Sequence, residues 1–177
     1  MIGRLLLAAV FFFSFTEPGV KSQPVQWNAN RKLSWSDFKA MPSENSTNAA
    51  LTSSGILMSF TTNGETFHYE LSCSFDQNSS WGRVKNEYIL AHEQGHFDIA
   101  ELYTRKLNKA LQGYRYQSDS FNKDINTIYR NTMKELQMMQ DQYDEQTDHS
   151  RNVIQQKNWL VRIFNSLEDL KAFSDYK

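Results

Sequence analysis

Cysteine is almost absent from this chain of 177 residues, because Cys73 is the only one. A single cysteine excludes an internal disulfide, so an exported domain of this size must be held together by core packing or by a metal ion. Cys73 itself falls on the apolar side of an alternating segment. That position favours a small buried hydrophobe over a reactive thiol.

Proline and glycine are scarce beyond the first half of the chain. All three prolines lie at or before Pro42, and Gly113 is the only glycine after Gly95. Because these residues interrupt helices, loops and strands are predicted first and long helices afterwards. We therefore expect an α+β fold. In it, a small antiparallel sheet with a hairpin packs on a long helix and an antiparallel second helix, in a zincin-like layout with a further C-terminal helix.

Long apolar runs are also missing, apart from one at the beginning. Met1–Arg4 is a short basic stretch, and Leu5–Phe15 is an apolar stretch too short to cross a bilayer. This pattern is typical of a secretory signal peptide, with cleavage predicted before Gln23. We therefore expect a signal peptide over residues 1–22, a secreted or periplasmic location, and no stable membrane anchor after cleavage.

Charge of either sign is not in excess in the mature chain. Residues 1–22 hold two of the 19 basic and one of the 20 acidic side chains, which leaves 17 basic and 19 acidic ones. A nearly neutral domain carries neither a nucleic-acid footprint nor a polybasic membrane patch. The remaining length, about 155 residues, suits a single domain over residues 23–177.

One hairpin is predicted clearly. Apolar and polar side chains alternate from Phe67 to Phe75, which is the period of a half-buried strand. Ile56–Phe60 is the expected partner strand. Asn63 and Gly64 lie between the two segments, and both residues tolerate the positive φ that a tight hairpin turn requires.

Three helices are predicted after the hairpin. The first is expected from Ser80, as its N-cap, to about Gln112, with Gly113 as its C-terminal cap. The second begins near residues 118–120 and carries an apolar stripe that ends at Tyr143. The third covers approximately residues 152–164.

Residues 92–96 read HEQGH and fall within the first of these helices. In a helix, His92 and His96 project from one face about one turn apart, so both imidazoles can bind one Zn²⁺ ion. Glu93 is turned by about 100° from His92 and can reach a water on the metal without being a ligand. The spacing therefore predicts a zinc hydrolase in which Glu93 is the general base.

A catalytic zinc site needs a third protein ligand and one open position. Asp98 and Glu101 are nearest in sequence, but they lie about 240° and 180° around the helix from His92. Both side chains therefore point away from the face that carries the two histidines, and neither is expected to be a ligand.

The third ligand is expected from the segment that follows the second helix. At 1.5 Å per residue, an antiparallel second helix regains the level of His96 near residue 134, and that of His92 near residue 138. The next segment, 143–150, contains one histidine, His149, which we predict to be the third ligand. Carboxylates bind zinc at similar distances, so three neighbours compete with it: Asp144, Glu145 and Asp148.

Tyr143 ends the apolar stripe close to this segment. Two interpretations are open. The first is an aromatic residue of the core. In the second, the Tyr143 hydroxyl stabilises the oxyanion of a tetrahedral intermediate.

These segments resemble a secreted bacterial family that is catalogued as a domain of unknown function, and for which a zinc-dependent protease activity has been suggested. The similarity lies in LSWSDFKAMP (33–42), HEQGHFDIAELYTRKL (92–107) and YDEQTDHS (143–150), with Gln155 and Trp159 beyond. The resemblance implies that Asp98 and Glu101 matter. The family pattern has Glu where this chain has Gln146, and Gly where it has Ser150, while His149 is retained.

The expected function is that of an exported zinc-dependent metallopeptidase whose substrate is a protein or peptide. An extended peptide would pair with the hairpin edge beside the HEQGH helix. Two alternatives stay open at this point. One is a zinc hydrolase that acts on an amide of the cell envelope, and the other is a binding module that zinc merely stabilises.

Overall fold

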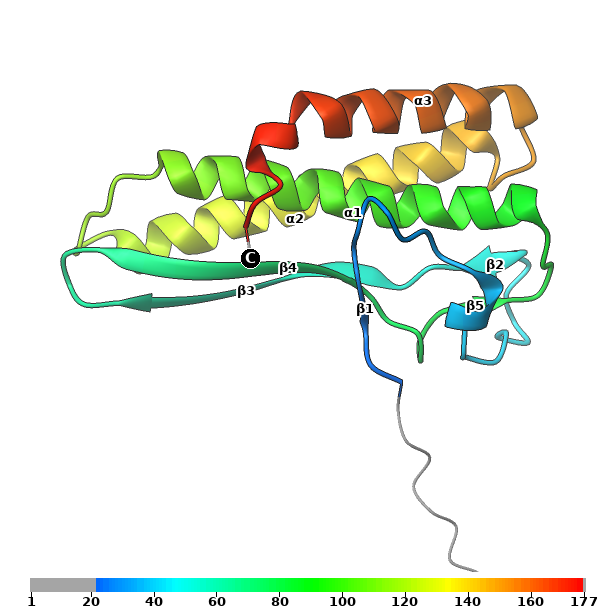
Figure 1. Cartoon of the computed structure of the whole chain (residues 1–177), viewed down its shortest axis with the longest axis horizontal. Coiled ribbons are helices and arrows are strands. Elements are labelled where there is room, and N and C mark those ends of the chain that lie inside the picture. The colour runs from blue at the N-terminus through cyan, green and yellow to red at the C-terminus, as the bar shows by residue number, and fades with distance from the viewer. Residues whose placement is uncertain (1–21, 177) are drawn as a thin grey trace, which may run out of the picture.

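The computed structural model describes residues 22–176, so nearly all of the expected signal peptide lies outside the described part (Figure 1). Its elements are β1 (Val25–Gln26), a short 3-10 helix η1 (Trp35–Asp37), β2 (Ala50–Leu51), β3 (Ser54–Thr62), β4 (Phe67–Phe75), β5 (Trp81–Gly82), α1 (Glu87–Gly113), α2 (Phe121–Thr147), α3 (Val153–Asp169) and a second 3-10 helix η2 (Lys171–Phe173). The α+β prediction is confirmed. Among the described helices, none has the length and apolarity of a membrane span.

The hairpin forms as predicted. β3 and β4 pair antiparallel over their whole lengths, and β1 adds to the far side of β4, which gives the order β1-β4-β3. Gly64 has a φ of 90°, and the Asn63 side chain accepts hydrogen bonds from the backbone N–H groups of Glu65 and Thr66. The alternating residues Leu71, Cys73 and Phe75 are buried.

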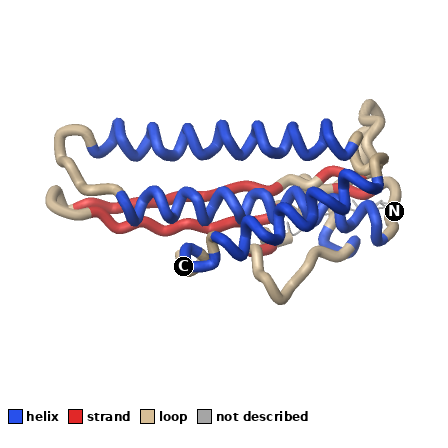
Figure 2. The backbone as a smooth tube through the Cα atoms, turned by 90° about the horizontal axis from the view of Figure 1, so that it is seen from above, coloured by secondary structure: helices blue, strands red, loops and turns tan. Residues whose placement is uncertain are grey.

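The helices are stacked on one side of this sheet. Figure 1 shows the strands below, α1 and α2 in the middle and α3 on the outer side. Seen from above, α1 runs over the strands while α2 lies to one side of them (Figure 2). α1 therefore has protein on most of its circumference, which is why polar residues such as Glu101 and Asn108 are buried in it.

α1 begins later than the predicted start at Ser80. Trp81 and Gly82 pair with β2 as the strand β5, so they are not available to a helix. The Ser80 hydroxyl donates to the Asp76 carbonyl and accepts from the Ser53 N–H instead of capping a helix. Asn86 is the N-cap, and its side chain accepts a hydrogen bond from the Ile89 N–H at 2.8 Å.

Two acidic residues of α1 attach the ends of the domain to this helix. Asp98 accepts a hydrogen bond from Trp27 Nε1 at 2.7 Å, near the N-terminal strand. Glu101 accepts from Arg105 Nε at 2.8 Å and from the hydroxyl of Tyr176. This gives Asp98 and Glu101, which the sequence resemblance marked as important, a role in holding the fold together.

The helices α1 and α2 approach each other closely at Gly95 and Tyr143. Tyr143 is completely buried, and its ring stacks on His92 with the centroids 4.6 Å apart. Its hydroxyl donates to the His92 carbonyl at 3.3 Å. A Cβ atom at position 95 would lie 2.5 Å from the Tyr143 hydroxyl oxygen, so only glycine permits this packing.

Gly95→Ala should therefore destabilise the domain although alanine is the better helix former. Overpacking a buried aromatic ring costs about 2–3 kcal/mol of unfolding free energy, measurable by urea denaturation. Gly113→Ala, at the end of the same helix, is the matched control, because a Cβ atom there would meet no described atom within 4 Å. It should be neutral or stabilise by up to about 1 kcal/mol. Equal effects of the two substitutions would contradict the close contact.

Candidate metal centre

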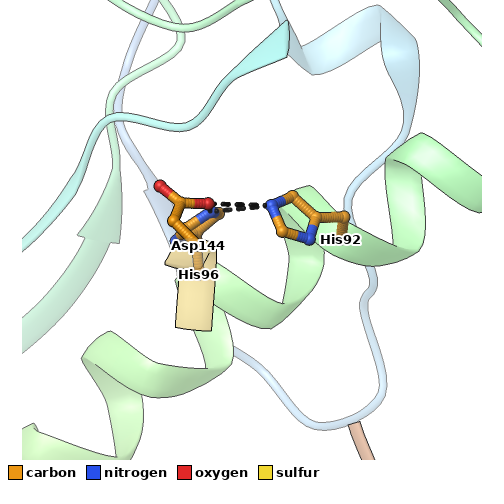
Figure 3. Close-up of side chains that lie close together, drawn as sticks. All are labelled: His92, His96 and Asp144. Carbon is orange, nitrogen blue, oxygen red and sulfur yellow. Dashed lines mark hydrogen bonds and ion pairs between the residues drawn. The ribbon is translucent and has the colours of Figure 1, made fainter. Parts of the chain in front are cut away.

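Three side chains from two helices converge where the first turns of α1 pack against the last turns of α2. Asp144 Oδ1 lies 3.1 Å from the Nε2 atoms of both His92 and His96, and these two nitrogens are 3.2 Å apart. Figure 3 shows the three side chains facing one another, with dashed lines that join His92 to the other two. Among the described residues, these three side chains are the ones whose potential ligand atoms lie close enough together to bind one metal ion.

The donor set and its spacing fit zinc. Zinc binds nitrogen and oxygen at about 2.0–2.2 Å, which places neighbouring ligands of a tetrahedral site about 3.3–3.6 Å apart. The three atoms need to separate by only a few tenths of an ångström to reach this spacing. Two imidazoles and a carboxylate also leave a fourth position open, as a catalytic zinc site requires.

Gln140 fixes the orientation and tautomer of His96. Its side-chain Nε2 donates to the His96 carbonyl at 2.9 Å, so its Oε1 faces the ring and accepts from His96 Nδ1 at 2.6 Å. In the neutral ring with its proton on Nδ1, Nε2 would direct its lone pair at the cluster. Such a hydrogen bond to the remote nitrogen is the usual support of a metal-binding histidine.

His92 is held differently. Its Nδ1 is buried without a hydrogen-bond partner among the described residues, and the ring of Tyr143 stacks on the face of its imidazole. The position of His92 therefore depends on packing rather than on a hydrogen bond to Nδ1.

The protonation properties of the three groups follow from burial and mutual contact. Burial lowers the pKa of His92. Burial also acts to lower the pKa of His96, but hydrogen bonding to Asp144 and its charge outweigh this effect and raise it. Burial acts to raise the pKa of Asp144, but the two histidines hold it well below its usual value. The Asp144 carboxylate is therefore ionised and ready to bind a cation at neutral pH.

Glu93 lies beside the cluster and is held by the strand side of the domain. The Thr52 hydroxyl, between β2 and β3, donates to Glu93 Oε2 at 2.7 Å. Glu93 is buried and is not one of the three clustered residues, as expected for a base that is not a ligand. Neither Thr52 nor Gln140 was identified from the sequence.

A cavity of about 230 Å³ opens onto these groups. One wall is the segment 48–54, which includes β2 and the first residue of β3, and the opposite wall is α2. The side chains of His92, Glu93 and His96 also line it. The predicted residues of the HEQGH motif thus share one solvent-connected space.

The structure places Asp144, one of the competing carboxylates, where His149 was predicted. His149 is half exposed, and its Nδ1 lies 3.7 Å from Asp144 Oδ1, outside the three-residue cluster. The reason is the register of α2, which passes His96 at Gln140 rather than near residue 134. α2 begins at Phe121, one to three residues later than predicted, so the later start accounts for only part of this shift.

Of the two interpretations of Tyr143, the structure agrees with the first, an aromatic residue of the core. Its hydroxyl donates to a backbone carbonyl and its side chain is completely buried, so it does not line the cavity. Burial raises the pKa of this hydroxyl. The geometry gives no support to an oxyanion role for Tyr143, whose ring packs on the face of His92 instead.

The turn after α2 has an unusual backbone. Asp148, His149 and Ser150 all have positive φ, of 50°, 49° and 73°. Residues other than glycine adopt this region at a cost. At a φ of 73°, as at position 150, glycine would have a lower steric cost than the serine that is present.

Comparison with known proteins identifies a family. The model of a family described as "Bacterial protein of unknown function (DUF922)" matches residues 23–150. This stretch contains the whole candidate metal centre and ends at the left-handed turn. No curated protein and no solved structure matches the chain.

Asp144→Ala should weaken zinc binding by at least about 100-fold, because even the loss of a partner behind a ligand costs about 10–100-fold. Isothermal titration of the metal-free protein measures this. Asp141→Ala is the matched control, since Asp141 also lies on α2 and lines the cavity but is not in the cluster. Unchanged zinc affinity in Asp144→Ala would exclude Asp144 as a ligand.

Ser150→Gly should stabilise the domain by about 1 kcal/mol, because glycine adopts a φ of 73° without steric cost. Thermal or urea unfolding measures the change. Ser166→Gly, within α3, should have the opposite sign and cost about 1 kcal/mol. A destabilised Ser150→Gly variant would show that the turn is not strained at this position.

Proposed function

Because this chain belongs to that bacterial family of unknown function, its activity has to be inferred from the site, and we propose that it is an exported zinc-dependent metallopeptidase. The observation that carries the proposal is the buried carboxylate of Glu93 beside the cluster of His92, His96 and Asp144, in one cavity. A metal that only stabilised the fold would need no such carboxylate and no open cavity.

The chain's own residues divide the work of hydrolysis. His92, His96 and Asp144 would hold the ion, which supplies a Lewis acid that polarises the carbonyl and lowers the pKa of water. Glu93 accepts a proton as the water oxygen bonds to the carbonyl carbon, and later gives it to the amine nitrogen when the C–N bond breaks. The overall reaction consumes one water and yields a carboxylic acid and an amine.

Thr52 positions the proposed base. The Thr52 hydroxyl oxygen lies 2.7 Å from Glu93 Oε2 and 3.2 Å from the Glu93 backbone carbonyl oxygen. Its single hydrogen is directed to the nearer of these two acceptors, Oε2. The other carboxylate oxygen, Oε1, is left to accept the proton of the attacking water. The strand side of the cavity is thus part of the proposed catalytic machinery.

The cavity wall supports an extended peptide as the substrate. β3 is an edge strand in the order β1-β4-β3, and its first residue, Ser54, lines the cavity together with residues 48–52. Backbone groups on such an edge can pair with a peptide in extended conformation. A peptide lying there would run between the strand edge and α2, across the face of Glu93.

Glu93→Gln should keep the metal and lose the activity. Glutamine preserves the shape of the side chain but cannot accept the proton, so hydrolysis should fall by about 10²–10⁴-fold. Denatured proteins and peptide libraries serve as substrates, with cleavage sites read by mass spectrometry and zinc content measured in the same samples.

Glu87→Gln is the matched control, because Glu87 lies on the same helix in an exposed position at its first turn. Activity that survives in Glu93→Gln with zinc bound would exclude the mechanism. If the wild type binds zinc but leaves every peptide intact, a different substrate class is indicated.

A further inference from the structure

The left-handed turn over residues 148–150 lies at the rim of the cavity and is held in place by several contacts. The His149 N–H donates to the Asp144 carbonyl at 2.8 Å, and the Asn152 N–H donates to the Thr147 carbonyl at 2.8 Å. The Tyr88 hydroxyl donates to the carbonyl of Ser150, whose side chain is buried. A costly backbone conformation that is fixed from both sides is typical of functional sites.

The consequence of this turn is the position of one side chain. His149 lines the cavity, and half of its side-chain surface is exposed. Its Nδ1 lies 3.7 Å from Asp144 Oδ1, which is too long for a hydrogen bond. The ring thus lies next to a proposed ligand of the candidate metal centre. Its nitrogens make no hydrogen bond to a described residue, so the ring can donate one to a substrate.

The charged side chains that line the cavity are mainly acidic. The described residues that line it include the carboxylates of Glu93, Asp141 and Asp144 but no lysine or arginine. The Tyr143 hydroxyl is committed to a backbone carbonyl, and the Gln140 amide is committed to His96. Apart from the proposed metal ion, negative charge that develops on a substrate oxygen in this cavity therefore meets no lysine or arginine among the described lining residues, and a nearby hydrogen-bond donor would stabilise it further.

We propose that His149 is a catalytic residue whose imidazole N–H donates a hydrogen bond to the carbonyl oxygen of the scissile amide as charge develops on it. This inference rests on the proposed hydrolase function. It assigns to His149 the role of a donor to the substrate, in place of the role of a metal ligand. The strained turn is what aims the ring at the cavity.

Three measurements on His149→Ala test this role. Cobalt(II), loaded in place of zinc, reports the ligand set through its visible absorption spectrum, and titration gives the metal affinity. Cleavage kinetics give kcat and KM separately. Binding of a peptidyl phosphonate, whose tetrahedral anionic group mimics the reacting centre, is followed through the cobalt spectrum and needs no turnover.

The expected result is an unchanged cobalt spectrum and metal affinity, with kcat lower by about 10²–10³-fold and KM little changed. Phosphonate binding should weaken by at least about tenfold. Arg151→Ala is the control next to the turn, because Arg151 is exposed and does not line the cavity. It should change none of the three measurements.

Two results would overturn the assignment. An altered cobalt spectrum with a loss of metal affinity would make His149 a ligand, and unchanged phosphonate binding would make it a bystander. A wild type that binds the phosphonate but cleaves no peptide would contradict the peptidase proposal, whereas the phosphonate comparison would still decide the role of His149.

Discussion

The contact between Gly95 and Tyr143 sets how α1 and α2 lie against each other, and the candidate metal centre depends on that relation. Without a side chain at position 95, the ring of Tyr143 reaches the backbone of α1 and stacks on His92. Residues three or four apart share a helix face, so Gln140 and Asp144 then face His96 and the histidine pair. This one close approach thus positions both Asp144, a proposed ligand, and Gln140, which orients the proposed ligand His96.

The strand side of the domain contributes the other half of the site. Thr52 holds Glu93, and the segment that contains it forms the cavity wall opposite α2. α1 lies between these two walls and carries both histidines and the proposed base. Asp98 and Glu101 on its other sides attach the N-terminal segment and Tyr176. The helix that carries the chemistry is therefore also the one that most of the fold is attached to.

The sequence was sufficient for those features that depend on local periodicity. The alternation from Phe67 to Phe75 predicted β4, and the spacing of His92 and His96 predicted a pair on one face of a helix. It also indicated that the segment near residue 144 returns to the site. The predicted start of α1 at Ser80 was wrong, because the pairing of Trp81 and Gly82 with β2 is a long-range contact that local patterns do not show.

The identity of the third clustered residue depended on helix register, which the sequence does not determine. A difference of about six residues in where α2 passes α1 is enough to exchange His149 for Asp144, because each helical turn presents a different side chain. The signal that was available is the spacing of Gln140, Tyr143 and Asp144 on one helix face. The contact of Tyr143 with Gly95 is what directs this helix face to the site.

A crystal structure of the zinc-soaked protein, with diffraction data collected on both sides of the zinc absorption edge, tests the proposed metal centre most directly. We expect a single strong anomalous peak within about 2.2 Å of His92 Nε2, His96 Nε2 and an Asp144 carboxylate oxygen, with Glu93 outside bonding distance. No peak between α1 and α2, or a peak bound by Glu93 in place of Asp144, would contradict it.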